Sequence, residues 1–177
     1  MTYARDISYA HSARTRGGRA LIRLMENTTG RVSLLKRAEG YEDDLAAGLG
    51  FFDAMVRRCG LTLDVMRGSL ADIPKRGPVI LIANHPYGIL DGLMLGHILS
   101  ETRGDFRIMA NAVFSQAPDL AHHLLPISFA EDRAALALNL ATRRTALDYL
   151  DQGGAIGIFP GGTVSTAARP FSQPMDP

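Results

Sequence analysis

A histidine and an aspartate stand at the two ends of a short turn. The stretch VILIANHPYGILDGLML, residues 79–95, runs from an apolar segment through His85, Pro86 and Gly88 to Asp91 and into a second apolar segment. An imidazole can accept a proton near neutral pH, and it does so better when a carboxylate accepts a hydrogen bond from its other nitrogen. Gly88 gives the backbone the freedom to fold back. The turn is therefore a candidate for a general base, His85, oriented by Asp91.

The same two residues also have a purely structural interpretation. Asp91 lies near the expected start of a helix, where a carboxylate can cap the first turn. His85 can then be an ordinary hydrogen-bonded turn residue. Spacing alone favours this interpretation over the catalytic one. The choice between them depends on the residues elsewhere in the chain.

Alternating strands and helices are expected to position this turn. Apolar runs and period-two alternation predict strands, and apolar residues at helical spacing predict helices between them. The strands are expected at 61–65, 79–83, 106–110, 126–129 and 155–159, and the helices at 41–59, 91–102, 118–125 and 132–152. This order predicts an α/β fold with a mostly parallel central sheet flanked by helices and preceded by N-terminal helices. Ligands bind such sheets outside the carboxyl ends of the strands.

Composition sets broad limits on the kind of protein. The 177 residues suffice for one domain with a sizeable core, and the hydrophobic fraction of 46% is ordinary for a globular protein. The single cysteine, Cys59, excludes an intrachain disulfide and fits a reducing compartment. No apolar run approaches the roughly 18 residues that a membrane span needs.

Positive charge is concentrated near the N-terminus. Residues 1–37 hold eight basic and two acidic residues, a net charge of +6, whereas the remainder carries −5. Such an arm is attracted to anionic surfaces, although a merely solvated arm explains the charge equally well. We expect residues 1–60 to form a basic arm with helices that can associate with a membrane. Residues 61–177 are expected to form the α/β domain, with its C-terminal part incomplete. Nucleic-acid binding ranks last because aromatic interleaving and recognisable motifs are lacking.

Three blocks follow one another in the expected α/β domain: NHPYGILDG at 84–92, LLPISFAEDR at 124–133 and FPGGT at 159–163. The first resembles the N-H-x-x-x-x-D signature of the glycerolipid acyltransferases, the superfamily that includes lysophosphatidic acid acyltransferases. The third resembles F-P-E-G-T of the same superfamily, and the second matches its hydrophobic segment ending in an arginine. Order, spacing and strand context agree over roughly residues 72–170. The resemblance implies an acyltransferase-like fold.

The resemblance also implies a reaction, the transfer of a fatty acyl group from acyl-CoA or acyl carrier protein to a hydroxyl of a lysolipid or other hydroxylipid. His85 would be the general base and Asp91 would orient it, with no covalent acyl-enzyme. The implied substrate-binding residues are Asn84, Tyr87, Gly88, Arg133, Phe159, Pro160, Gly161, Gly162 and Thr163. No metal and no cofactor besides the acyl donor is implied. The expected partners are a membrane lipid acceptor, the donor and a peripheral membrane surface on the cytoplasmic face.

The blocks depart from the family pattern in ways that bear on the acceptor. Five residues separate His85 from Asp91 where the common signature has four, as in a bacterial branch resembling lyso-ornithine lipid acyltransferases. Gly161 replaces the family's glutamate, and Val164 replaces an arginine thought to hold a phosphate. These losses favour an acceptor without a phosphomonoester. The alternative is a non-catalytic or truncated acyltransferase-like domain that binds a lipid or acyl chain without turnover.

Overall fold

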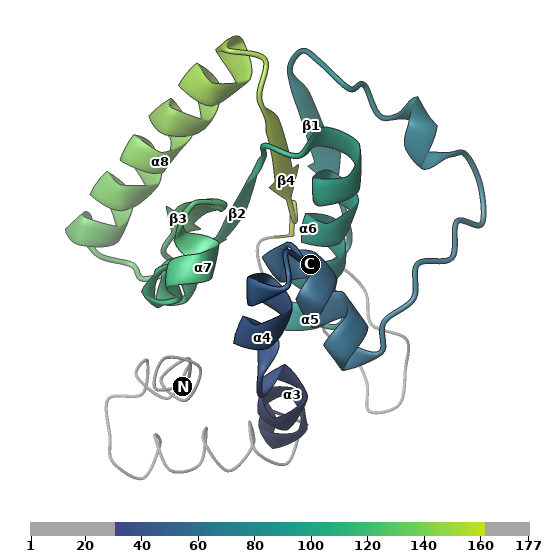
Figure 1. Ribbon diagram of the computed structural model, residues 1–177. Helices are drawn as coiled ribbons and strands as arrows, with labels where there is room; N and C mark the ends of the chain where they lie inside the picture. Colours follow the sequence, from purple (N-terminus) through teal and green to yellow (C-terminus); the bar gives the residue numbers. More distant parts are fainter. Residues whose placement is uncertain (1–30, 162–177) are drawn as a thin grey trace, which may run out of the picture.

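A four-stranded sheet with helices on both faces forms the centre of the molecule (Figure 1). The computed structural model describes residues 31–161. All strand pairs are parallel, in the order β1-β4-β2-β3. The predicted α/β fold, with its parallel sheet and preceding helices, is confirmed. The strands are β1 (Val79–Ile82), β2 (Arg107–Asn111), β3 (Leu124–Ile127) and β4 (Ala155–Ile158).

Two long helices, α6 and α8, cover opposite faces of this sheet. Two successive residues of β4 show this arrangement, because successive side chains of a strand point to opposite faces. Gly157 lies against Leu95 of α6, whereas Ile156 packs in a cluster with Ala146 of α8. The helices are α3 (Arg31–Ala38), α4 (Tyr41–Ala46), α5 (Phe51–Cys59), α6 (Ile89–Arg103), α7 (Pro118–Ala121) and α8 (Arg133–Asp151), with short 3₁₀ turns η2 (Leu70–Asp72) and η3 (Ala112–Gln116).

The larger core cluster lies on the α6 side of the sheet and includes α5. Phe52 of α5 is buried there together with Leu93 and Leu99 of α6 and Phe106. Helix α5 therefore shares a core with the α/β domain, although it belongs to the segment predicted to associate with a membrane. That role remains a prediction for residues 1–60, of which 1–30 lie outside the described part of the chain.

Two predictions of local structure are wrong. Residues 61–65 are irregular rather than a strand, with Leu63 and Val65 exposed, and no strand among residues 31–161 pairs with them. Alternation is not enough, because the backbone N–H and C=O groups of a strand need a partner strand. The helix predicted over 41–59 is interrupted between α4 and α5, where Gly48 has a φ of 93°. A left-handed glycine of this kind ends a helix.

The topology brings two of the sequence blocks to the same edge of the sheet. β1 and β4 pair along their whole length, with Ile82 opposite Ile158. The N–H of Ala83 extends the pairing by donating to the carbonyl of Ile158 at 3.2 Å. The turns that leave these two strands therefore start side by side. Within residues 31–161, no helix has both the length and the apolar character that crossing a membrane requires.

Candidate active site

The turn between β1 and α6 brings His85 and Asp91 together. Gly88, which precedes the first residue of α6, has φ 62° and ψ −120°, a conformation essentially restricted to glycine. It folds the chain back so that Asp91 lies in the first turn of α6. The Nδ1 atom of His85 lies 3.3 Å from Oδ2 of Asp91, and both side chains are largely buried. The five residues between His85 and Asp91, one more than in the family signature, therefore still allow the two side chains to make contact.

The geometry of this pair is that of an ion contact rather than of a well-aligned hydrogen bond. Nδ1 of His85 is buried and has no hydrogen-bond partner of good geometry within the described residues, despite its 3.3 Å contact. Oδ2 of Asp91 accepts instead from the backbone N–H of Tyr87 at 2.7 Å. That bond fixes the carboxylate beside the imidazole. Catalytic hydrogen bonds are often long in the absence of substrate and tighten when it binds.

Phe159, the residue that follows β4, holds the other side of the imidazole. The rings of His85 and Phe159 stack with centroids 4.1 Å apart and planes 24° from parallel. The first and third sequence blocks thus meet in one contact, although 74 positions separate these two residues in the chain. Stacking restricts rotation of the histidine ring, while its Nδ1 atom contacts Asp91.

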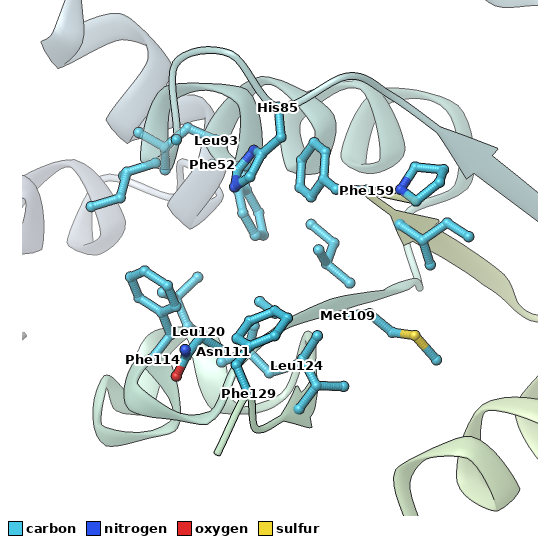
Figure 2. Close-up of a pocket in the computed structure, with 18 residues that line it drawn as sticks. Phe52, His85, Leu93, Met109, Asn111, Phe114, Leu120, Leu124, Phe129 and Phe159 are labelled. Atoms are coloured by element: carbon cyan, nitrogen blue, oxygen red, sulfur yellow. The ribbon is translucent and has the colours of Figure 1, made fainter. Parts of the chain in front are cut away.

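An apolar cavity of about 440 Å³ opens beside His85. Figure 2 shows His85 and Phe159 on one side of it, with Phe114, Leu120 and Phe129 across from them. Its lining is drawn from α5, α6, β2, β3, β4 and the segments that follow the strands, and it is mostly aliphatic and aromatic. Of the titratable residues between 31 and 161, only His85 lines it. A cavity of this size and character suits an apolar ligand with one reactive polar group.

The predicted substrate-binding residues are only partly brought together. Gly88, Phe159 and Pro160 line the cavity with His85. Tyr87 is 73% exposed and contributes its backbone N–H, as described above.

Other predicted residues lie away from the cavity lining. Asn84 and Gly161 are exposed. Arg133 is the first residue of α8 and lines a separate depression with Glu131. The remaining two, Gly162 and Thr163, lie outside the described part of the chain, so their roles stay predictions.

Several cavity residues were not predicted from the sequence. Phe52, Phe114 and Leu120 come from α5, η3 and α7, and Asn111 ends β2. The first three are ordinary apolar residues whose spacing resembles that of any core residue, so the sequence carries no signal for them. Asn111 follows a strand end, as the other site residues do, which is a signal that could have been used. Its Oδ1 accepts from the N–H of Val113 at 3.0 Å.

A second histidine and aspartate pair links α5 to α6, away from the cavity lining. Nδ1 of His97 lies 2.6 Å from Oδ1 of Asp53. With Glu101 these residues place three possible metal-ligand atoms within 4.8 Å of one another. The direct hydrogen bond already accounts for two of the three. No known ligand spacing supports a zinc site made of His85, Asp91 and His97, and His97 is paired with Asp53 instead.

Behind the cavity, burial lowers the pKa of the His123 imidazole, and the nearby positive charge of Arg107 acts in the same direction. The His123 ring stacks on Phe106 with centroids 4.4 Å apart and lies 5.4 Å from the ring of Phe52. A neutral imidazole therefore forms part of the packing behind the cavity wall.

Comparisons with known proteins agree with this geometry. Residues 68–174 match the protein-family model described as Acyltransferase. Neither the curated proteins nor the solved structures provide a significant match. The matched segment includes the His85 turn, the whole sheet and the turn after β4. Since the match spans more than half of the sequence, the chain belongs to the acyltransferase family.

Proposed function

We propose that the protein transfers a fatty acyl group from acyl-CoA or acyl carrier protein to a hydroxyl of a lysolipid or other hydroxylipid. One observation carries the proposal: an imidazole beside a carboxylate opens into an apolar cavity. The imidazole supplies a base, and the cavity supplies room for a hydrocarbon chain. Both belong to the segment that matches the acyltransferase family, except where α5 completes the cavity.

In the proposed reaction, His85 acts as the general base through Nε2. Nε2 accepts the proton of the acceptor hydroxyl as that oxygen attacks the thioester carbonyl, so a C–O bond forms. The C–S bond then breaks, and the leaving thiolate takes the proton from the imidazolium. Asp91 stabilises the imidazolium through its contact with Nδ1. The Tyr87 N–H keeps the carboxylate in place during both steps.

The acceptor is proposed to lack a phosphomonoester, as a lyso-ornithine lipid or another neutral or zwitterionic hydroxylipid does. No arginine or lysine lines the cavity in the described range 31–161. The glutamate expected in the third block is Gly161, and Val164 stands where the family often has an arginine. A doubly charged phosphate would therefore meet little compensating charge beside His85.

A peripheral location on the cytoplasmic face of a membrane is proposed together with this substrate class. Ile89 and Phe129 line the cavity while remaining 45% and 50% exposed, and Tyr87 stands exposed on the same turn as His85. Exposed apolar and aromatic side chains at a cavity mouth fit contact with lipid. The basic residues of segment 1–37 would add attraction to anionic headgroups.

His85→Ala is the test of the proposed function. We expect thioester-dependent acylation of a lysolipid to fall about 10²–10⁴-fold, because the general base is lost. Thiol release and lipid product should both be measured on the full chain. Unchanged thioester cleavage in the variant would show the catalytic assignment to be wrong. Fatty acid binding without any transfer by the wild type would favour the non-catalytic alternative.

The acceptor class requires a separate comparison. Lysophosphatidic acid and a lyso-ornithine lipid should be offered at equal concentration with the same donor. We expect the lyso-ornithine lipid to be acylated faster. A clear preference for the phosphate-bearing lipid would reject this part of the proposal while leaving the general-base role intact.

A further inference from the structure

One wall of the apolar cavity comes from outside the segment that matches the acyltransferase family. Phe52 lines the cavity from α5, whereas the match begins at residue 68. The Phe52 side chain is only 4% exposed. Figure 2 shows its ring close to Leu93, on the same side of the cavity as His85. Family membership therefore leaves open what this wall does.

Glycines on α6 show where the free space beside that helix ends. Gly92 and Gly96 are spaced four apart within α6, so they lie on one face of the helix. A Cβ atom added at Gly92 would meet nothing within 4 Å. A Cβ atom added at Gly96 would lie 2.1 Å from a ring carbon of Phe52. Gly88 and Gly92 line the cavity, and Gly96 does not.

The Phe52 ring therefore fills the space that the missing side chain of Gly96 leaves. Four residues of helix advance about 6 Å, so the filled position lies one turn beyond the open one. Aromatic rings support Phe52 from other directions, with Phe51, Phe106 and His123 at centroid distances of 5.3, 5.4 and 5.4 Å. Such close packing resists displacement of the ring by a ligand.

We propose that Phe52 sets the longest acyl chain that the site accepts. The chain would start at His85, pass the open face at Gly92 and stop against the Phe52 ring. The inference rests on the proposed function, because it assigns the cavity to the acyl chain. It adds a specificity-determining residue that lies outside the family's motifs.

Binding of free fatty acids tests this inference without requiring catalysis. Saturated fatty acids of eight to eighteen carbons should displace a fluorescent fatty acid, cis-parinaric acid, from the full chain. Each methylene buried in the cavity should tighten binding about fourfold. We expect this increase to stop at one chain length in the wild type, where the chain end reaches Phe52. This chain length is the break point.

Three variants locate that break point. Phe52→Ala should move it to longer chains by opening the wall. Gly92→Val should move it to shorter chains by placing a side chain in the open space. Because this variant leaves the α5 core intact, it tests the inference even if Phe52→Ala fails to fold. Met55→Ala is the control on the same helix, because it removes an apolar side chain that packs against the same core but does not line the cavity. Its break point should equal that of the wild type.

An unchanged break point in Gly92→Val, or equal shifts in Phe52→Ala and Met55→Ala, would overturn the inference. Acyl transfer with the same donor chain lengths separates the two proposals. If the break points move as expected but the wild type transfers no acyl group, the chain-length limit stands and the proposed function fails. If transfer proceeds and its chain-length profile is the same in all variants, the limit fails and the function stands.

Discussion

One histidine and aspartate pair lies at the start of α6 and a second joins the middle of α6 to α5, and the two differ in both burial and contact geometry. His97 and Asp53 make a direct 2.6 Å contact that joins α6 to α5. His85 and Asp91 are 3.3 Å apart on one turn, and the carboxylate accepts its hydrogen bond from a backbone N–H. His85 lines the cavity and His97 does not.

The comparison teaches that the pair proposed to be catalytic is not the one with the short, complete hydrogen bond. A pair that links two helices stabilises the fold through a direct hydrogen bond between its two side chains. A general base needs an uncommitted nitrogen facing substrate and a carboxylate that is fixed by other atoms. His85 and Asp91 fit this proposed role better than His97 and Asp53, because the Tyr87 N–H fixes the carboxylate and the imidazole lines the cavity.

Among these substitutions, Asp91→Asn should have the largest effect on acyl transfer. We expect acyl transfer to fall about 10²–10⁴-fold, because the amide cannot stabilise the imidazolium as a carboxylate does. The free energy of unfolding should change little, since an asparagine Oδ1 can still accept from the Tyr87 N–H. Steady-state kinetics with a thioester donor, together with urea denaturation, measure the two quantities.

Asp53→Asn is the matched substitution in the other pair. We expect acyl transfer to be retained and the free energy of unfolding to drop by about 1 kcal/mol, because a partly exposed charged hydrogen bond is weakened. Equal activity losses in the two variants would mean that both pairs act on the reaction and that the distinction drawn above is mistaken.

Phe159→Leu tests whether the ring stack with Phe159 orients His85. Loss of the ring stack removes about 0.5–1.5 kcal/mol of ring–ring interaction. If that interaction orients the base, kcat/KM should fall roughly two- to tenfold. A leucine keeps the site apolar, so fatty acid binding should be nearly unchanged. A change confined to chain binding, with kcat retained, would assign Phe159 to the cavity wall alone.

His123 provides the smallest expected effect and a third kind of histidine environment. Burial lowers the pKa of His123 in the folded state, so the unfolded chain binds a proton more readily. The contribution to stability is complete above the ordinary histidine pKa of about 6.5 and is lost as the pH falls below that value. Urea denaturation at pH 7.5 and pH 5.5 should show this loss. His123→Phe should show a smaller loss, and an equal one would contradict the assignment.

Local features of the fold were largely predictable from the sequence. The helix expected over 132–152 is found over Arg133–Asp151, and the Asp132 side chain caps its first turn by accepting from the N–H of Ala135. Boundaries near β3 were less accurate. The strand begins at Leu124 rather than at Pro126, and α7 ends at Ala121. Pairing with β2 draws residues 124 and 125 into the sheet, overriding their helix-like spacing.

By itself, the sequence determined which residue types stand at the strand ends and that His85 and Asp91 are close enough along the chain to meet. These are local matters, governed by backbone freedom at Gly88 and by the parallel order of the elements. Only the tertiary structure decided that β1 and β4 are neighbours, so that Phe159 stacks on His85. It also decided that Phe52 bounds the cavity. Apolar side chains that line a cavity have the same sequence pattern as those that fill a core, and packing between distant segments alone distinguishes the two.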